Sequence, residues 1–373
     1  MRILLDARLY GLENTGIGRY LVNLVDGLVE FGKSEDFEIL LRKKYFDKLD
    51  LPKNWHKVLV DIPHYSFEEQ IKLPSLINTR RPDLVHFPHF NVPVFWRGKF
   101  VVTIYDMTMH EQGFDATKLP KLIYLLKRIP YKMVFRSAVV RSKMVIVPSL
   151  YVAKRISAYF ALEKAKVEVI YPGYSLGGKD LKSLTGLKEQ KEKYFLYVGN
   201  VYPHKNLETL VKAILHLNKV LEVPAKLVVV CPRNEFESSL KNQIFALGAK
   251  DYVELTGFVS DGELSSLYKN SLALVYPSKS EGFGFQGLEA FSHKALVACS
   301  DLPVFKEVYG DSAIYFNQNS PEDTADKLLK VVNMESGQRE KIISTYPKVL
   351  KRYSWEKTAK ETLKVYKKAL EVF

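Results

Sequence analysis

The sequence predicts an α/β protein built from two doubly wound, parallel-sheet (Rossmann-like) domains. Short runs rich in Val, Ile and Leu alternate with longer segments whose apolar residues recur at helical spacing. A polar, lysine-rich stretch at 174–193 interrupts this alternation, which then starts again. The chain of 373 residues is also longer than one typical core. We therefore expect a first domain at 1–173, a linker at 174–193 and a second domain at 194–352.

The first half predicts six strands and four helices. Continuous apolar runs indicate strands at 2–8, 37–42, 83–88, 99–106, 144–149 and 167–173. Helical spacing indicates helices at 16–32, 67–82, 122–142 and 151–161, and we expect Pro74 to interrupt the second and a proline to kink the third.

The second half repeats this rhythm. Strands are predicted at 194–200, 226–232, 252–258, 272–278 and 296–300, and helices at 206–221, 236–248, 261–271 and 287–294. Ligands of open parallel sheets bind beyond the carboxyl ends of the strands. Two such domains facing each other predict an enzyme with a deep cleft between them.

The charge of +13 is unevenly distributed. Residues 116–162 contain no Asp or Glu but ten basic residues: Lys118, Lys121, Lys127, Arg128, Lys132, Arg136, Arg141, Lys143, Lys154 and Arg155. Three interpretations of this zone are open: a solvated helix face, a surface for anionic lipid, or a nucleic-acid site. The third is less well supported, because the sequence lacks the interleaved aromatic and basic motifs of nucleic-acid-binding folds.

Two cysteines, no signal-peptide pattern and no membrane-spanning run predict a cytoplasmic location, free in solution or peripheral on the cytoplasmic face of the membrane. The cysteines, Cys231 and Cys299, lie in or after apolar runs and are interpreted as buried thiols.

Three motifs carry the chemistry. The first is TGIGRY at 15–20, which joins a strand region to a helix start at Gly16 and Gly18. It lacks the GxGxxG spacing of a dinucleotide fingerprint, which leaves a tight turn or a loop that contacts substrate or phosphate.

The second motif, VYPHKNLETL at 201–210, follows a strand that ends at Gly199. Lys205 stands just before a helix whose N-cap is predicted to be Asn206, an arrangement that suits a phosphate. The alternative is an ordinary surface lysine.

The third motif is SEGFGFQGLEA at 280–290, a glycine-rich loop that opens a helix. Free N–H groups of such a loop bind anions or hydroxyls. Glu289, placed in about the first helical turn, suits vicinal hydroxyls, and Glu281 lies nearer the strand tip. Alternatively, Glu281 is a turn residue and Glu289 stabilises the helix dipole.

Taken together, these residues resemble the retaining glycosyltransferases of the GT-B fold, in the large fourth family of nucleotide-sugar transferases (group 1). SEGFGFQGLEA is similar to the family's E-x7-E motif, and YFLYVGNVYPHKNLETL to its strand, phosphate lysine and helix. TGIGRY, DLVHFPHF, VVTIYD, VIVPS, VEVIYPG and SWEKTAKETLKVY match in order. The pattern is similar to bacterial mannosyltransferases of polysaccharide biosynthesis.

The resemblance implies a nucleotide-sugar donor, GDP-mannose first and UDP-glucose or a UDP-N-acetylhexosamine next, in the second domain. It implies that Lys205 binds the diphosphate, Glu289 the ribose and Glu281 the hexose. The other implied donor contacts are Gly16, Gly18, Arg19, Gly199, Asn200, Phe283, Gly284, Phe285 and Leu288. The first domain is implied to bind a glycan or lipid-linked acceptor, and a last helix at 353–373 to cross back to it.

Departures from the family pattern concern three positions. Asn200 stands where relatives often carry an arginine that helps to neutralise the leaving diphosphate. Part of that neutralisation is therefore expected from Lys205 or Arg19. Tyr105, before Asp106, replaces a common histidine and is expected to donate to the sugar, which makes both residues catalytic candidates. Cys231 stands where a glycine is common, at the nucleotide end.

The expected reaction places negative charge on the leaving diphosphate, which lysine, arginine and helix N-termini can stabilise. No Asp-x-Asp motif is placed like a metal site, so we expect no metal and no cofactor besides the nucleotide-sugar co-substrate. The alternatives are a nucleotide-sugar epimerase or a glycan phosphorylase of the same architecture, and a non-enzymatic module that binds anions or nucleic acid through the basic zone.

Overall fold

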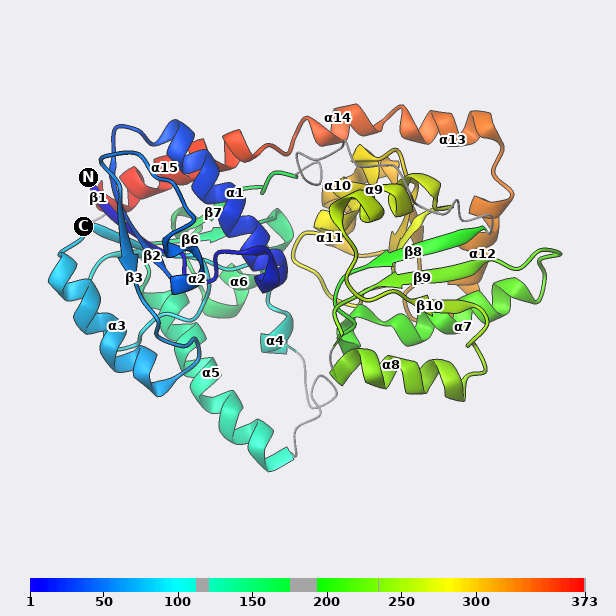
Figure 1. The fold of residues 1–373 in the computed structure, drawn as a ribbon, viewed down its shortest axis with the longest axis horizontal. Helices are drawn as coiled ribbons and strands as arrows, with labels where there is room; N and C mark the ends of the chain where they lie inside the picture. The colour runs from blue at the N-terminus through cyan, green and yellow to red at the C-terminus, as the bar shows by residue number, and fades with distance from the viewer. Residues whose placement is uncertain (112–120, 175–192, 234, 372–373) are drawn as a thin grey trace. The chain divides into compact units, whose positions relative to one another are not determined.

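The computed structural model describes residues 1–111, 121–174, 193–233 and 235–371. The chain divides into two compact units, an N-terminal unit of residues 1–173 with 353–373 and a C-terminal unit of residues 174–352 (Figure 1). Most of the predicted linker lies outside the described residues. Each unit is described by itself, and the cleft expected between them stays a prediction.

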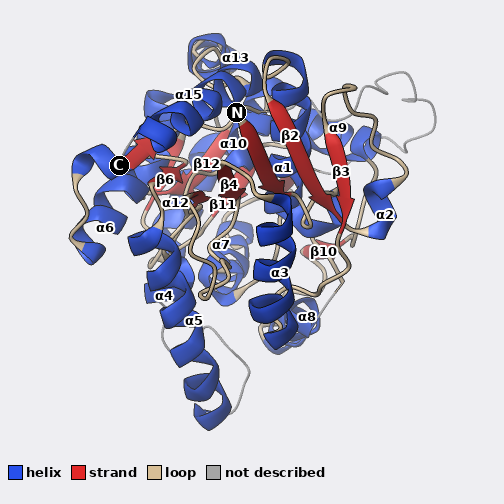
Figure 2. Cartoon of the chain, turned by 90° about the vertical axis from the view of Figure 1, so that its left-hand side faces the viewer, coloured by secondary structure: helices blue, strands red, loops and turns tan. Residues whose placement is uncertain are grey.

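The N-terminal unit has a seven-stranded parallel sheet in the order β3-β2-β1-β4-β5-β6-β7. Its strands are β1 Arg2–Asp6, β2 Asp36–Leu41, β3 His56–Leu59, β4 Leu84–Phe87, β5 Phe100–Thr103, β6 Met144–Val147 and β7 Val167–Val169. Its helices are α1 Thr15–Phe31, α2 Lys43–Phe46, α3 Phe67–Arg80, α4 Thr108–Glu111, α5 Lys121–Arg141, α6 Leu150–Phe160 and α15 Trp355–Glu371 (Figure 2).

The C-terminal unit has a six-stranded parallel sheet in the order β10-β9-β8-β11-β12-β13. Its strands are β8 Tyr194–Val198, β9 Lys226–Val230, β10 Val253–Leu255, β11 Leu274–Tyr276, β12 Val297–Ser300 and β13 Ile314–Phe316. Its helices are α7 Leu207–Asn218, α8 Glu235–Ala246, α9 Asp261–Asn270, α10 Phe285–Ser292, α11 Pro303–Tyr309, α12 Pro321–Val332, α13 Ser336–Ile343 and α14 Tyr346–Leu350. Two parallel α/β sheets confirm the predicted fold class.

Alternating side chains of the N-terminal sheet form two cores. Leu4 packs with the helices α3, α5 and α6 on one face, whereas Ile3 and Leu5 pack with α1 and α15 on the other. This two-residue period is what a strand buried on both faces requires. Both faces are therefore covered by helices, which is the reason that its strands read as continuous apolar runs.

Helix α15 packs on the rest of the N-terminal unit, although the C-terminal unit lies between them in the sequence. The Tyr366 hydroxyl lies 2.7 Å from Nδ1 of His86, whose Nε2 lies 2.9 Å from the Thr103 hydroxyl. Burial lowers the pKa of His86 to about 3, so the ring is neutral. An added Cβ at Gly27 would lie 2.8 Å from Cβ of Ala359, which shows how closely α1 and α15 approach.

Several details differ from the sequence prediction. Helix α3 continues through Pro74, which is buried and therefore gains packing where it loses a main-chain hydrogen bond. Strand β3, with a half-exposed edge pattern, was not predicted. Helices α11 to α14 were also missed, as was β13, whose run of three residues is too short for a clear strand pattern. Within the described residues, the helices include none whose length and apolarity would suffice to cross a bilayer.

Candidate functional site

The candidate site of the C-terminal unit lies where the strand order of its sheet reverses. β8 has β9 on one side and β11 on the other, so the loops that leave β8 and β11 diverge at their carboxyl ends. These two loops are tied together: the Lys279 N–H donates to the His204 carbonyl at 2.8 Å, and the Asn206 side chain donates to the Pro277 carbonyl at 3.1 Å.

Lys205 and Glu281 meet at this point. The Lys205 ammonium lies 2.5 Å from Oε1 of Glu281, and the Ser278 hydroxyl donates to the same oxygen at 2.7 Å. The side chains of Lys205 and Glu281 are only 14% and 11% exposed. Lys205 ends the single 3₁₀ turn Pro203–Lys205 between β8 and α7, which fixes the start of its side chain. The structure therefore brings together two residues that lie 76 positions apart.

The electrostatics of this pair favour the ionised carboxylate. Burial raises the pKa of Glu281, but the charge of Lys205 and the hydrogen bonds from Lys205 and Ser278 outweigh burial and hold the pKa below its usual range. Tyr276 lies beneath, with its ring centroid 5.4 Å from the Lys205 ammonium and its hydroxyl donating to the Gln286 amide oxygen at 3.0 Å. Burial raises the pKa of Tyr276, so its phenol stays protonated.

The glycine-rich loop closes against a buried tyrosine. Gly284 has a φ of +99°, and its carbonyl accepts a hydrogen bond from the Tyr309 hydroxyl at 2.5 Å. A Cβ at Gly284 or Gly287 would lie 2.3 Å from a Tyr309 atom, so both positions require glycine. Helix α10 begins at Phe285, whose ring packs edge-on against that of the buried Phe283.

Glu289 lies in the second turn of α10, whereas the sequence placed it in about the first. The residue is 6% exposed, and its carboxylate accepts a hydrogen bond from the Tyr268 hydroxyl at 3.2 Å. The alternative, in which Glu289 stabilises the helix dipole from the first turn, is therefore not supported. Leu288 is fully buried, which limits any contact of its own with a ligand to the backbone.

Gly199 and Asn200 form the sharp exit from β8. Gly199 has a φ of +141°, a conformation that favours glycine, and the Asn200 carbonyl accepts a hydrogen bond from the buried Tyr197 at 2.5 Å. Asn206 is the N-cap of α7 by position, but it has a φ of +60° and its side chain caps no backbone N–H of the helix. Its amide donates to the Pro277 and Gln318 carbonyls, and its oxygen accepts from the Thr209 hydroxyl at 2.8 Å.

The glycines of TGIGRY lie inside the first turn of α1, so the interpretation of this motif as a loop is corrected. A Cβ at Gly18 would lie 1.8 Å from the Gly11 carbonyl oxygen, whereas a Cβ at Gly16 would meet no heavy atom within 4 Å. Gly18 is thus required for packing, and the exposed Gly16 is not. Arg19 is half-buried, and its carbonyl accepts a hydrogen bond from Asn23.

Tyr105 and Asp106 follow β5 in the N-terminal unit. The Tyr105 hydroxyl is buried and has no hydrogen-bond partner within the described part of the chain, and its ring packs edge-on against Tyr20 at 5.2 Å. Asp106 accepts a hydrogen bond from the Thr108 N–H at 2.8 Å. Their expected sugar contact stays a prediction.

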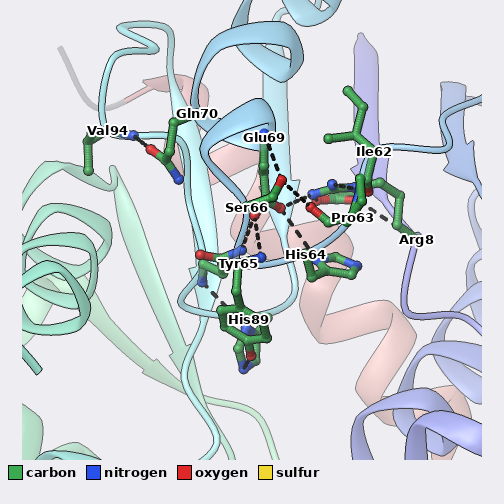
Figure 3. A network of polar contacts seen from close by, with 12 residues as sticks. Arg8, Ile62, Pro63, His64, Tyr65, Ser66, Glu69, Gln70, His89 and Val94 are labelled. Carbon is green, nitrogen blue, oxygen red and sulfur yellow. Dashed lines mark hydrogen bonds and ion pairs between the residues drawn. The ribbon is translucent and has the colours of Figure 1, made fainter. Parts of the chain in front are cut away.

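The sequence prediction missed a second polar cluster, at the point where the order of the N-terminal sheet reverses between β1 and β4 (Figure 3). Arg8, 1% exposed, donates to both carboxylate oxygens of Asp6 at 2.8 and 2.7 Å and to Glu69 at 2.6 Å. Asn91 donates to the other oxygen of Glu69. The available signal was an Asp-x-Arg pair at the end of an apolar strand.

No set of three or more Asp, Glu, His or Cys side chains in the described ranges is arranged to hold a metal ion. Both cysteines are buried, as predicted. Burial raises the pKa of Cys231 to about 11, so this thiol stays protonated.

Comparisons with known proteins match both units. The model for Glycosyltransferase Family 4 matches residues 14–177, and that for Glycosyl transferases group 1 matches residues 181–349. The O-antigen chain mannosyltransferase RfbU of Salmonella typhimurium is 28% identical, over 93% of this chain and 94% of its own.

Two solved structures show the same fold. The sucrose-phosphate synthase of Thermosynechococcus elongatus superposes with a TM-score of 0.75 at 15% identity, over 99% of this chain and 98% of its own. Anabaena HepE, solved with UDP and glucose, superposes with a TM-score of 0.73 at 14% identity, over 99% of this chain and 100% of its own.

Two parallel-sheet units with this order of elements define a glycosyltransferase of the GT-B fold. The chain belongs to the Glycosyl transferases group 1, with a Glycosyltransferase Family 4 domain preceding the group 1 domain. The epimerase, phosphorylase and binding-module alternatives receive no support from these matches.

The ionised Glu281 is expected to make stability depend on pH. Its pKa in the folded protein lies below the 4.5 of an unperturbed glutamate. Its contribution is therefore fully present above pH 4.5 and is lost as the pH falls through the folded pKa. Urea unfolding at a series of pH values should show a stability difference between wild type and Glu281→Gln that shrinks on acidification. Glu254→Gln, an exposed substitution on β10, should show no such trend.

Gly18→Ala and Gly16→Ala form a matched pair on α1. Gly18→Ala should lower the melting temperature, because its methyl group overlaps the Gly11 carbonyl. Gly16→Ala should leave stability unchanged or raise it, since alanine is better than glycine in a helix by about 1 kcal/mol. Thermal unfolding checks both, and equal destabilisation would contradict the assignment.

Proposed function

We propose that the protein is a retaining, metal-independent hexosyltransferase that moves mannose from GDP-mannose to a hydroxyl of a glycan or lipid-linked glycan. The observation that carries the proposal is the nearly buried Lys205–Glu281 pair at the strand-order reversal of the group 1 domain. The choice of mannose is supported by the relative RfbU, which is named an O-antigen chain mannosyltransferase.

Lys205 supplies the charge that a departing diphosphate needs. A nearly buried ammonium interacts with a phosphate more strongly than a hydrated one, because fewer water molecules screen it. The loop that carries Lys205 leads directly into α7, whose N-terminal N–H groups favour negative charge. With these groups in place, no metal ion and no further cofactor is required in our proposal.

Glu281 holds the hexose in this proposal. Lys205 and Ser278 both contact Oε1 and fix the carboxylate, so Oε2 is the oxygen assigned to a sugar hydroxyl. Glu289, eight residues on, is assigned to the ribose. The two acids then position opposite ends of the donor, and the leaving phosphate takes the proton of the attacking acceptor hydroxyl, which is consistent with retention.

A nucleotide is further supported by the structure of HepE, which was solved with UDP. UDP-glucose and UDP-N-acetylhexosamines are the second and third donor candidates. Thermal unfolding with GDP, UDP and their sugars discriminates among them, because a ligand that binds only the folded state raises the melting temperature.

Glu281→Ala is expected to lose most transfer of mannose from GDP-mannose, about a hundredfold or more, while the protein stays folded. The measurement is GDP release with and without a mannose-terminated oligosaccharide, paired with circular dichroism. Glu254→Ala is the matched control and should keep wild-type rates. Near wild-type turnover by Glu281→Ala would refute the assigned role.

We also propose that α5 attaches the protein to an anionic membrane surface on the cytoplasmic face. Its exposed apolar residues Leu126, Ile129, Met133 and Val140 recur at three- to seven-residue spacing and share one stripe. The exposed Lys132 and Arg136 flank this stripe, and Lys127 lies on its other side. Apolar stripes with basic flanks suit the headgroup region of an anionic bilayer.

Part of the basic zone is already engaged within the protein. Arg141 donates to the Val94 carbonyl at 2.7 Å, Arg128 to the Tyr124 hydroxyl at 2.9 Å, and Arg155 pairs with Glu111. These contacts occupy guanidinium donors, and Glu111 offsets the charge of Arg155. Nucleic acid is not proposed as a partner, because the chain lacks the interleaved aromatic and basic motifs of such folds. Lys118 lies outside the described residues.

Vesicle sedimentation tests the attachment. The protein should bind vesicles of phosphatidylcholine with phosphatidylglycerol, bind pure phosphatidylcholine less, and lose binding at 0.5 M salt. Lys132→Glu with Arg136→Glu should weaken binding about thirtyfold or more, since the two lost charges together contribute about 2 kcal/mol near such a surface. Lys212→Glu with Lys330→Glu on the other unit is the control, and equal loss there would reject α5 as the contact.

A further inference from the structure

The polar cluster at the β1–β4 reversal of the N-terminal sheet is not used by the chemistry proposed above. Its base is a buried frame in which Arg8 pairs with Asp6 and with Glu69. Arg8 and Glu69 are labelled in Figure 3. Burial raises the pKa of both carboxylates, but Arg8 at Asp6, and His64 together with Arg8 at Glu69, outweigh burial and hold the pKa below its usual value. The charges of the frame are therefore paired with one another. A ligand would contact the neighbouring residues Tyr65, His64 and His89 instead.

Tyr65 is the first of these residues. It has a φ of +59°, in the left-handed region that bulky side chains avoid, and its side chain is 65% exposed. Arg81 and Ala161 share this conformation as helix C-caps, where it is common, but Tyr65 precedes a helix. Its backbone is held by its N–H, which donates to Glu69 at 2.8 Å. Neither burial nor backbone preference explains a tyrosine here, and strain of this kind is often found where a ligand is bound.

His64 is an independent observation. Its Nδ1 lies 3.4 Å from Oε1 of Glu69, which orients the ring, and its side chain is 10% exposed. Its Nε2 is buried and has no hydrogen-bond partner within the described residues. An unsatisfied buried nitrogen is costly, so a ligand or water hydroxyl there would be favoured.

His89 completes the cluster from the loop after β4. Its Nε2 lies 3.4 Å from the Tyr65 hydroxyl, and its ring packs against Phe90 with centroids 4.2 Å apart. Burial lowers the pKa of His89 to about 4, so the ring is neutral at physiological pH. The rings of Tyr65 and Phe90 and the imidazoles of His64 and His89 therefore lie together beside the frame, whose charges are paired.

We propose that Tyr65, His64 and His89 form a subsite for a neutral sugar ring of the acceptor. The exposed ring of Tyr65 offers a π-face to the C–H face of a pyranose, and Nε2 of His64 accepts a hydrogen bond from one of its hydroxyls. A phosphate is disfavoured, because the one cation of the frame, Arg8, is already bound to two carboxylates. This inference rests on the proposed function, in which a glycan hydroxyl is the acceptor.

Saturation-transfer NMR tests the subsite without turnover. The probes are the methyl α-glycosides of mannose, glucose, galactose and N-acetylglucosamine, with glucose 6-phosphate as the anionic probe and saturating GDP present throughout. Wild type should saturate the ring protons of at least one neutral glycoside more strongly than those of the phosphate. Tyr65→Gly should weaken binding about tenfold, the loss of one aromatic contact, and His64→Ala should weaken it too.

Matched variants separate binding from folding. Tyr65→Gly removes the ring and relieves the left-handed strain, so its melting temperature should equal or exceed that of wild type. Tyr65→Phe keeps the ring and should retain most binding. Phe245→Ala removes an aromatic ring that is 78% exposed on α8 and should change nothing.

The outcomes distinguish this subsite from the donor chemistry. No glycoside binding by wild type, equal binding by Tyr65→Gly, or preference for the phosphate would overturn the subsite, whatever the donor assay shows. If glycosides bind through Tyr65 while wild type neither binds a nucleotide nor transfers mannose, the proposed function fails and the subsite stands.

Discussion

The reversal of strand order in each parallel sheet is the constraint on which both polar clusters depend. Where β8 stands between β9 and β11, and β1 between β2 and β4, the loops leave in opposite directions and their backbone groups cannot all be covered by one helix. Charged side chains can therefore be held at these points, where they are partly shielded from water but remain accessible to a ligand. Elsewhere along the strands the same positions are filled by apolar residues of the two-sided core.

The two clusters handle buried charge differently. In the N-terminal unit Arg8 has two carboxylate partners and an almost fully buried side chain, so it serves as a frame. In the C-terminal unit Lys205 has one carboxylate partner, and both side chains retain some exposure. A lysine paired with a single carboxylate keeps donors for another anion, whereas the charge of Arg8 is already balanced by two carboxylates. This difference is the physical basis for assigning phosphate to one unit and a neutral ring to the other.

Much of the fold and part of the site followed from the sequence. Lys205 and Glu281 both follow apolar runs that were predicted to be parallel strands, whose carboxyl ends lie at one edge of a sheet. Gly284 was identified as a loop glycine, although the reason, a hydrogen bond from Tyr309 to its carbonyl, involves a residue 25 positions away. Strand β3 was not predicted, because an edge strand needs little apolar character. The helix interruption expected at Pro74 was wrong, because burial compensates for the lost hydrogen bond.

By itself, the sequence determined the parallel-sheet class, the family, and the residue types offered at each strand end, because these follow from local periodicity and motif spacing. Only the tertiary structure decided which of those residues meet. Lys205 reaches Glu281 across 76 positions, Glu69 reaches Arg8 across 61, and Tyr65 is held in a left-handed conformation by that same carboxylate. Such pairings depend on how strands are ordered and how loops diverge, which is a property of the packed sheet and is absent from any short stretch of the chain.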